Sequence, residues 1–209
     1  MSRYSSLCFL ARIIVKLLFR VDVKGVKHIP PEGAFLIAPN HISFVDPVVV
    51  GAFVPRDLHY MARASLFEIP FLGWLLGICQ VVPVRKYRPQ PQTMKKAISI
   101  LKGGKGLLIF PEGTRNTTGK LKKGGPGLGM LAFVSGAPVI PTNISGTERA
   151  LPVDARWIRL EKVRVQFGKP VFSDEFKANE PKRVFYQKLT DEVMARIKDL
   201  QALPPFPPP

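Results

Sequence analysis

The sequence predicts a single α/β domain whose mostly parallel or mixed sheet is flanked by helices. Strand-like apolar runs alternate with helix-like segments along the chain, as in sheets whose strands are joined by helical crossovers. The 209 residues, 46% of them hydrophobic, suffice for one domain with a real core. We therefore expect a domain over residues 21–202, an amphipathic helix over 1–20 and a proline-rich extended tail at 203–209.

The expected strands are short apolar runs rich in Val, Ile, Leu and Phe. They cover residues 21–25, 34–38, 58–61, 80–84, 106–110, the neighbourhood of 139–140, and 163–167. Ligands in such sheets usually bind at the carboxyl ends of strands. Polar clusters follow Ala38, Val84 and Phe110, so these three places are where we expect a functional site.

Two helices are expected from apolar residues at helical spacing. The first lies between Val84 and Gly106, is closed by Gly103 and Gly104, and has an apolar face of Met94, Ala97, Ile98 and Leu101. The second lies near the C-terminus, and its apolar face is Phe185, Leu189, Val193 and Ile197.

The apolar run from Leu7 to Phe19 predicts a helix that lies on a membrane surface. Arg12, Lys16 and Arg20 recur at every fourth residue and would form one basic stripe on a helix. The run is shorter than the about 20 apolar residues of a membrane span, and no small-residue cleavage site follows it. Basic side chains beside apolar surface can reach lipid phosphates. The alternative is a helix packed on the protein's own core.

Charge is the first clue to the partners of the chain. The 31 Lys and Arg residues against 15 Asp and Glu residues give a formal net charge of +16. Such an excess attracts nucleic acid, anionic lipid headgroups, phosphorylated ligands or acidic carrier proteins. A nucleic-acid-binding module is supported by charge alone, because no binding signature is present and aromatic residues are not interleaved with the basic runs. Cys8 and Cys79 lack CxxC spacing, so neither a disulfide framework nor a zinc site is expected.

The segment after the strand at 34–38 pairs a histidine with an aspartate. His41 and Asp46 are five residues apart and would not share a helical face. They can meet if His41 lies in a loop and Asp46 caps the next helix, which Pro47 at its first turn favours. Asp46 could then fix the imidazole tautomer while the other ring nitrogen takes a proton from a hydroxyl. A helix cap beside an unrelated surface histidine would explain the same pattern.

A second polar segment, residues 110–116, directly follows the strand at 106–110. It combines the carboxylate of Glu112, the flexible Gly113, the hydroxyl of Thr114 and the guanidinium of Arg115. Arginine presents a planar fork that suits phosphate oxygens, and a carboxylate can accept hydrogen bonds from hydroxyls or hold the arginine. The alternative is a polar turn with a local ion pair. Arg85 ends another apolar strand, so we expect it near the same place.

These segments together resemble four ordered blocks of the glycerolipid acyltransferase family, most closely the bacterial 1-acyl-glycerol-3-phosphate acyltransferases. The blocks are Asn40-His41-x-Ser43-x-x-Asp46, Arg85 at a strand end, Phe110-Pro-Glu-Gly-Thr-Arg115 and Val139-Ile140-Pro141. The resemblance implies that His41 and Asp46 are catalytic. It also implies acceptor binding by Asn40, Ser43, Arg85, Glu112, Gly113, Thr114 and Arg115, and an acyl-donor or pocket role for Val139, Ile140 and Pro141.

The function that this resemblance implies is acyl transfer from acyl-CoA or acyl carrier protein to the sn-2 hydroxyl of lysophosphatidate, with no metal and no cofactor. The expected partners are membrane phospholipids and not nucleic acid, and the expected location is the cytoplasmic face of the cell membrane. The apolar stretch 66–84, interrupted by Glu68, Pro70 and Pro83, would be either a core helix or a wall for the acyl chain. Another lysophospholipid or a lyso-aminolipid is the alternative acceptor, and a non-catalytic binding protein is the alternative class.

Overall fold

The computed structural model describes residues 3–68, 77, 81–84, 91–116, 118–152, 155, 157–176 and 180–202, with only the backbone described at 3–9 and 63. Arg85, Cys79, most of the apolar stretch 66–84 and the tail 203–209 lie outside the described residues. The predictions made for them therefore remain predictions.

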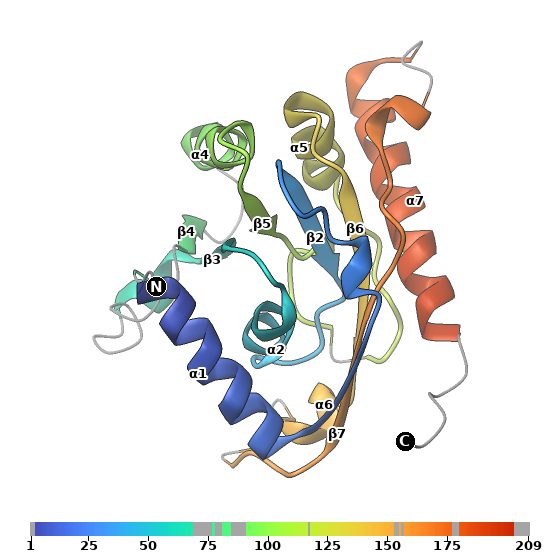
Figure 1. Cartoon of the computed structure of the whole chain (residues 1–209). Helices are drawn as coiled ribbons and strands as arrows, with labels where there is room; N and C mark the ends of the chain where they lie inside the picture. The colour runs from blue at the N-terminus through green and yellow to red at the C-terminus, as the bar shows by residue number, and fades with distance from the viewer. Residues whose placement is uncertain are drawn as a thin grey trace.

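The described strands form one mixed sheet of seven strands in the order β1-β7-β6-β2-β5-β3-β4 (Figure 1). All neighbouring pairs are parallel except β6 and β7, which run antiparallel. The predicted mostly parallel or mixed α/β sheet is thus confirmed. The strand bounds are β1 Arg20–Lys24, β2 Phe35–Pro39, β3 Leu58–Arg63, β4 Val81–Val84, β5 Gly106–Leu108, β6 Val139–Ser145 and β7 Lys162–Phe167.

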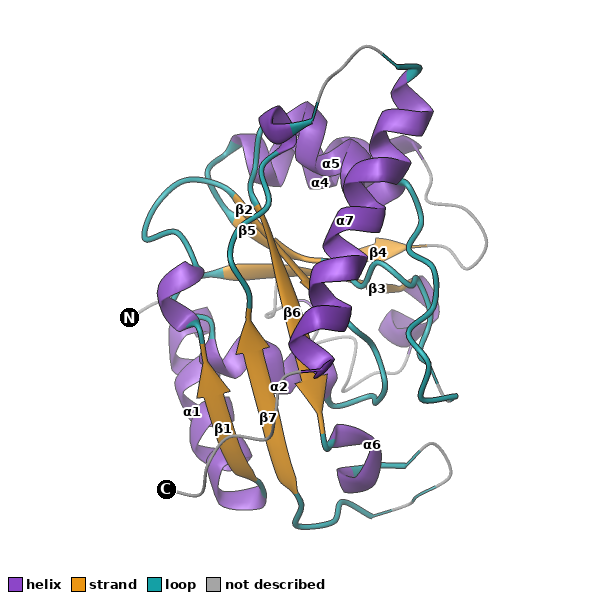
Figure 2. Ribbon diagram, turned by 90° about the vertical axis from the view of Figure 1, so that its right-hand side faces the viewer, coloured by secondary structure: helices purple, strands orange, loops and turns teal. Residues whose placement is uncertain are grey.

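The sheet separates two apolar cores, as the central strand β2 shows most directly. Phe35 and Ile37 point into a core shared with α1 (Arg3–Leu18) and α2 (Asp46–Phe53), whereas Leu36 and Ala38 point into a core on the opposite face. This alternation follows from the two-residue period of a strand. The second core is covered by α4 (Pro91–Lys102), α5 (Gly127–Ser135) and α7 (Lys182–Ala202). Figures 1 and 2 show the two helical layers on either side of the sheet.

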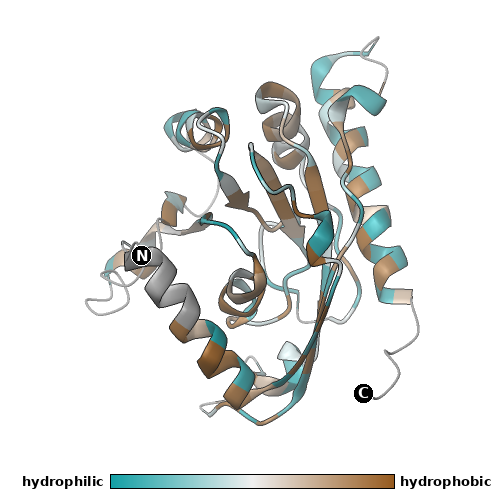
Figure 3. Cartoon of the chain, viewed as in Figure 1, coloured by the Kyte–Doolittle hydropathy of each residue, from teal (hydrophilic) through white to brown (hydrophobic). Residues whose placement is uncertain are grey.

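Both helices predicted from apolar spacing are confirmed, as α4 and α7. The predicted apolar face of α7 is fully inside the second core, and Gly104 ends α4 with a left-handed φ of 73°. Figure 3 shows the resulting alternation of hydrophobic and hydrophilic residues along α7. The remaining short elements are the helix α6 (Thr147–Ala150) and three 3-10 turns, η1 (Val26–His28), η2 (Ala64–Glu68) and η3 (Ser173–Glu175).

The N-terminal helix α1 is both part of the core and exposed to solvent. Val15 and Phe19 are buried against the first core, so the helix is packed on the domain and is not a detached segment. The opposite stripe is apolar and between 40% and 77% exposed, and consists of Leu10, Ile13, Ile14 and Leu17. Arg20 belongs to β1, so the predicted three-residue basic stripe is wrong at its last member: only Arg12 and Lys16 lie on the helix. Within the described ranges, no helix is long and apolar enough to cross a membrane.

Candidate active site

The candidate site forms where the loops after β2, β5 and β6 meet. β2 has β5 on one side and β6 on the other, and all three run parallel, so their carboxyl ends lie at one edge of the sheet. The loop after β2 carries His41, the loop after β5 carries Glu112, and α6 after β6 begins with Thr147. Polar residues that are far apart in the sequence are therefore brought together, as expected for this class of sheet.

The central contact of the site is the bond between His41 and Asp46, whose Nδ1 and Oδ2 atoms are 2.9 Å apart. The same Oδ2 accepts the backbone N–H groups of Ile42 at 2.7 Å and Ser43 at 2.8 Å. Oδ1 accepts the hydroxyl of Thr147 at 2.6 Å. Asp46 is 0% exposed, so these four donors replace the water that its charge would otherwise need.

This network determines which nitrogen of His41 can act on a substrate. An ionised carboxylate only accepts hydrogen bonds, so His41 Nδ1 must carry a proton and donate it to Asp46. In the neutral imidazole the lone pair then lies on Nε2. The ring is stacked on Phe110 with 3.8 Å between centroids, and its side chain is 16% exposed. His41 is thus held from two sides and still reachable, which suits a general base.

Asp46 does not cap the next helix, contrary to the prediction from the sequence. Helix α2 begins at Asp46 with Val45 preceding it, and no side-chain cap is present. The carboxylate instead turns back onto Ile42 and Ser43, whose N–H groups point at it from the preceding loop. Pro47 lies in the first turn as predicted. Both carboxylate oxygens are already occupied, Oδ2 by the imidazole and the two loop N–H groups and Oδ1 by the hydroxyl of Thr147.

Glu112 binds three segments of the site to one another. Its Oε1 accepts the backbone N–H of His41 at 3.0 Å, and its Oε2 accepts Asn116 Nδ2 at 3.1 Å and the backbone N–H of Lys122 at 3.0 Å. Asn116 also donates its backbone N–H to the carbonyl oxygen of His41. The backbone of His41 is therefore fixed on both sides by the loop after β5. These bonds show that Glu112 positions the histidine loop, and its predicted contact with substrate hydroxyls stays a prediction.

Arg115 lies over the ring of Phe44, with 3.3 Å from its guanidinium carbon to the ring centroid. Phe44 is 56% exposed, so this contact lies at the surface, where a ligand can approach. Gly113 adopts a φ of 68° and its N–H bonds the carbonyl of Phe110, which closes the turn that leads to the arginine. Thr114 is exposed on this turn. The guanidinium of Arg115 and the imidazole of His41 thus belong to two loops that are hydrogen-bonded to each other.

Two residues predicted to bind substrate have their side chains occupied inside the protein. Asn40 is 2% exposed, donates through Nδ2 to the carbonyl of Ile144 and accepts the N–H of Ile144 through Oδ1. Ser43 is 1% exposed and donates to the carbonyl of Leu151. Both side chains fasten the histidine loop to β6 and the segment after it. A structural role follows for both.

The third predicted group, Val139, Ile140 and Pro141, lies within the sheet and not on a ligand surface. All three are buried in β6 beside β2. Val139 faces the second core and Ile140 the first. Their contribution is therefore to hold β6 in register with β2, so that the end of β6 delivers α6 to the site. Their predicted role in binding the acyl donor or shaping the pocket stays a prediction.

Three contacts of the site were missed from the sequence: Phe110 stacked on the imidazole, Asn116 bound to Glu112, and Thr147 bound to Asp46. Phe110 and Asn116 are the first and last residues of the second polar segment, so their neighbourhood was visible in the sequence. Thr147 was not, because it is 101 residues from Asp46 and only the pairing of β2 with β6 brings it close.

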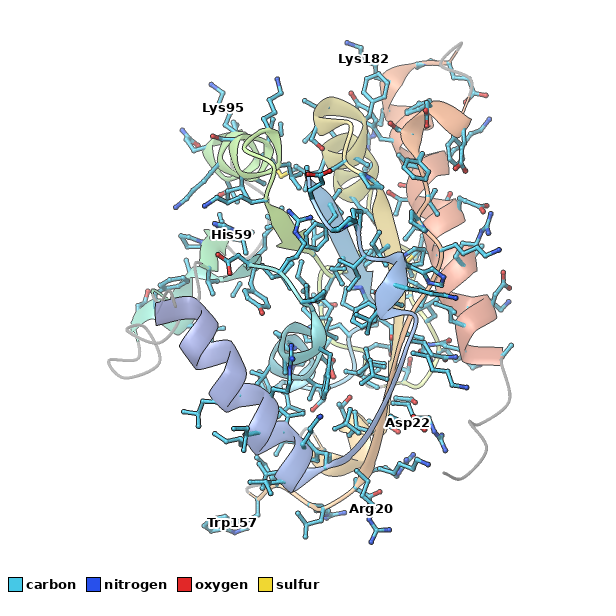
Figure 4. All side chains as sticks on the ribbon, in the orientation of Figure 1. Arg20, Asp22, His59, Lys95, Trp157 and Lys182 are labelled. Atoms are coloured by element: carbon cyan, nitrogen blue, oxygen red, sulfur yellow. The ribbon has the colours of Figure 1, made fainter. Side chains whose placement is uncertain are left out.

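The other two histidines have different surroundings. His28 Nδ1 lies 2.9 Å from the carbonyl oxygen of Phe167. Burial of the His59 ring on β3 lowers the pKa of His59, and the nearby Lys105 lowers it further. Figure 4 labels His59 near the β3 and β4 end of the sheet. Neither is paired with a carboxylate in the described part of the chain, so His41 is the candidate base.

Known proteins are similar to this chain in sequence and in fold. The family model for acyltransferases matches residues 20–145, which covers β1 to β6, the histidine loop and the loop after β5. The chain belongs to this acyltransferase family. A 1-acyl-sn-glycerol-3-phosphate acyltransferase of Bacillus subtilis (strain 168) is 29% identical over 192 residues, which are 91% of this chain and 92% of that protein.

Two further similarities extend this result. The crystal structure of the 1-acyl-sn-glycerophosphate (LPA) acyltransferase PlsC from Thermotoga maritima superposes with a TM-score of 0.79 at 25% identity, covering 97% of this chain and 81% of that one. The chloroplastic 1-acyl-sn-glycerol-3-phosphate acyltransferase BAT2 of Brassica napus is 27% identical over 79% of this chain. The chain spans about half the length of that plant relative, 49%.

Proposed function

We propose that this acyltransferase transfers a fatty acyl group from a thioester donor to the sn-2 hydroxyl of 1-acyl-sn-glycerol-3-phosphate, at a membrane surface. The observation that carries the proposal is the buried Asp46 carboxylate on His41 Nδ1, which leaves Nε2 available as a base. The names of relatives from bacteria and plants support the acceptor. Acyl-CoA and acyl carrier protein both supply the required thioester.

In the proposed reaction, His41 Nε2 takes the proton of the sn-2 hydroxyl as its oxygen attacks the thioester carbonyl. The resulting imidazolium is stabilised by Asp46, which is already desolvated and oriented. Collapse of the tetrahedral intermediate breaks the carbon–sulfur bond and forms the ester, and the imidazolium returns its proton to the departing thiolate. The direct test is release of free thiol from acyl-CoA or acyl carrier protein on addition of lysophosphatidate. No thiol release with either donor would overturn the proposal.

Arg115 is proposed to bind the phosphate of the acceptor, together with Arg85. Replacing Arg115 by alanine should lower kcat/KM for lysophosphatidate by roughly ten- to a hundredfold, because a charge-assisted hydrogen bond contributes about 1.5–3 kcal/mol. Arg115→Lys should recover little, since a point charge cannot form the bidentate fork. Initial rates are measured over acceptor concentration at a fixed donor concentration.

The control for this prediction is Arg183→Ala, which removes the same charge from an exposed position on α7 and should leave kcat/KM unchanged. Equal losses of Arg115→Ala on lysophosphatidate and on an acceptor without a phosphate monoester would show that Arg115 only supports its loop. Faster native turnover on a lyso-aminolipid would identify that class as the acceptor.

Thr147 is proposed as a positioning residue for Asp46. Thr147→Val keeps the shape of the side chain but removes the donor at 2.6 Å from Oδ1, so kcat should fall about tenfold while KM for both substrates changes little. Thr147→Ser keeps the hydroxyl and should retain most of kcat. Near-native kcat in Thr147→Val, or a loss in Thr147→Ser as large as that in Thr147→Val, would show that the hydrogen bond to Oδ1 does not explain the role of Thr147.

Membrane association is proposed to use the exposed apolar stripe of α1. Replacing Ile14 and Leu17 by glutamine should weaken binding to phospholipid vesicles about tenfold or more, because each large apolar side chain contributes about 1.5–3 kcal/mol when buried. The fold should persist, since the two side chains are 44% and 77% exposed. Vesicle co-sedimentation measures the effect. Val134 and Val184, exposed on α5 and α7, provide the matched double replacement, which should bind as the native chain does.

A further inference from the structure

A pocket separate from the histidine site lies between α1, β1 and the end of α2. It has a volume of about 360 Å³, in the size range of small-ligand sites. Its lining combines two cations of α1 with apolar side chains, and none of the lining residues is acidic: Arg12, Lys16, Val21, Val23, Val26, Phe53 and Pro55. All of these side chains are at least partly exposed, so a ligand can reach them.

The arginine of this pocket is held in place by the end of α2. Arg12 Nε donates to the carbonyl oxygen of Ala52 at 2.7 Å. Ala52 lies in the last turn of α2, where backbone carbonyls have no partner within the helix and a cation is favourable. This bond uses one of the five N–H donors of the guanidinium. The cation is thus fixed at the pocket and keeps its ability to bind an anion.

The pocket lies beside the exposed apolar stripe of α1. Successive helical residues are about 100° apart, so Lys16 lies about 100° around the helix from Leu17. Arg12 lies one turn away on the same side as Lys16. With the apolar stripe in a membrane, both cations would be at the height of the lipid phosphates, and the pocket would open into the headgroup layer. Figures 1 and 3 show α1 along the outside of the domain, with α2 between it and the sheet.

We propose that this pocket binds the headgroup of one anionic phospholipid, with its phosphate on Arg12 and Lys16 and its glycerol and upper acyl chains on Val21, Val23 and Phe53. The proposal rests on the membrane association proposed above and goes beyond it. A general basic surface attracts all anionic lipids without saturating at one molecule. A pocket with cations on one wall and apolar side chains on the others binds one amphiphile, and it selects for the anionic phosphate and the apolar chains together.

The test uses soluble short-chain lipids, below the concentration at which they form micelles, and the full chain. Dihexanoyl-phosphatidylglycerol should bind saturably with one molecule per chain by calorimetry, and dihexanoyl-phosphatidylcholine at least about tenfold more weakly. Lys16→Glu should weaken binding of dihexanoyl-phosphatidylglycerol about tenfold or more. Lys95→Glu makes the same charge change on the exposed face of α4 and should weaken it less than about twofold. Figure 4 shows Lys95 at the opposite end of the molecule from Arg20.

Each alternative has a distinct outcome. If Lys16→Glu and Lys95→Glu weaken lipid binding equally, the lipid is held by general charge attraction. Binding that does not saturate would indicate the same. Either result overturns the proposal of a specific lipid site. Full competition by an equal concentration of inorganic phosphate would identify a phosphate site without lipid selectivity and also overturn it.

A filling variant tests the apolar wall. Val26→Phe, with its unfolding midpoint recorded, should reduce lipid binding without a change in charge. If Val26→Phe does not fold, the comparison of Lys16→Glu with Lys95→Glu still tests whether the pocket binds the lipid. His41→Ala should bind the lipid as the native chain does, so failure of the pocket and failure of the proposed reaction are distinguishable.

Discussion

His41→Ala is expected to lower acyl transfer by roughly 10²–10⁴-fold, because removal of a general base typically has an effect of this size. The ring is replaced by a methyl group, which cannot take the proton of the acceptor hydroxyl. The backbone bonds of residue 41 to Glu112 and Asn116 do not depend on the ring, so the loop should keep its position. Thiol release is measured with saturating lysophosphatidate, and vesicle binding and the unfolding midpoint are measured on the same protein.

The matched control for this variant is His59→Ala. His59 is a partly buried histidine on β3, outside the site, so its replacement should leave kcat nearly unchanged even if it alters stability. Near-native turnover of His41→Ala would remove His41 from the reaction. Comparable losses in both variants would show that the effect comes from stability and not from chemistry.

The fold was predictable because each central element has a local signature. β2 is apolar at every position, as a strand buried on both faces must be, and the predicted segment 34–38 lies within one residue of the observed Phe35–Pro39. The faces of α4 and α7 were visible from apolar residues at helical spacing. The antiparallel pairing of β7 with β6 was not visible, because both directions satisfy the same alternation of apolar residues on β7, which is buried at every second position.

The contact between His41 and Asp46 was predictable from the sequence, and the contacts that support it were less so. His41 and Asp46 are close in sequence, and their pairing in the structure agrees with the predicted contact. The roles of Asn40, Ser43 and Glu112 depend on partners in other segments, between 71 and 108 residues away, which no local pattern reveals. A polar residue in a conspicuous segment is therefore ambiguous from sequence alone: its side chain can face a ligand or hold the segment in place. The hydrogen bonds distinguish the two.

The N-terminal helix shows the same limit. Its sequence allowed either a membrane helix or a core helix, and the structure uses different faces of one helix for burial and for exposure. Val15 and Phe19 are buried while Leu17, between them, is 77% exposed. The sequence could not separate these faces because all of them are apolar. The consequence for experiment is that deletion of the helix would unfold part of the core, whereas replacement of exposed residues tests the membrane role alone.

Asp46→Asn is expected to lower kcat roughly a hundredfold while leaving the fold largely intact. An amide has one oxygen and one NH₂ group, whereas the carboxylate accepts donors at both oxygens. The amide oxygen can take the place of Oδ2 and keep the bonds from His41, Ile42 and Ser43, whose N–H groups cannot reverse. The NH₂ group then faces Thr147, whose hydroxyl can rotate to accept it. The imidazole would keep its tautomer and lose only the negative charge beside it.

The expected loss follows from that charge. A hydrogen bond to a charged group contributes about 1.5–3 kcal/mol, and the upper part of this range applies here because Asp46 is 0% exposed. Since about 1.36 kcal/mol corresponds to a tenfold change in rate, the imidazolium that forms in the transition state should be disfavoured by roughly a hundredfold. KM for lysophosphatidate should change little, because the charge acts only when the imidazolium forms.

Asp46→Ala separates this electrostatic role from the structural one. Alanine offers no acceptor to the buried N–H groups of Ile42 and Ser43, and each buried donor left unsatisfied costs about 1–3 kcal/mol. For a chain of this size, 1 kcal/mol lowers the unfolding midpoint by about 2–4 °C, so alanine should lower it by several degrees and asparagine much less. Activity should fall in both variants. If asparagine retains near-native kcat while alanine loses both stability and activity, Asp46 holds the loop and contributes no charge to the reaction.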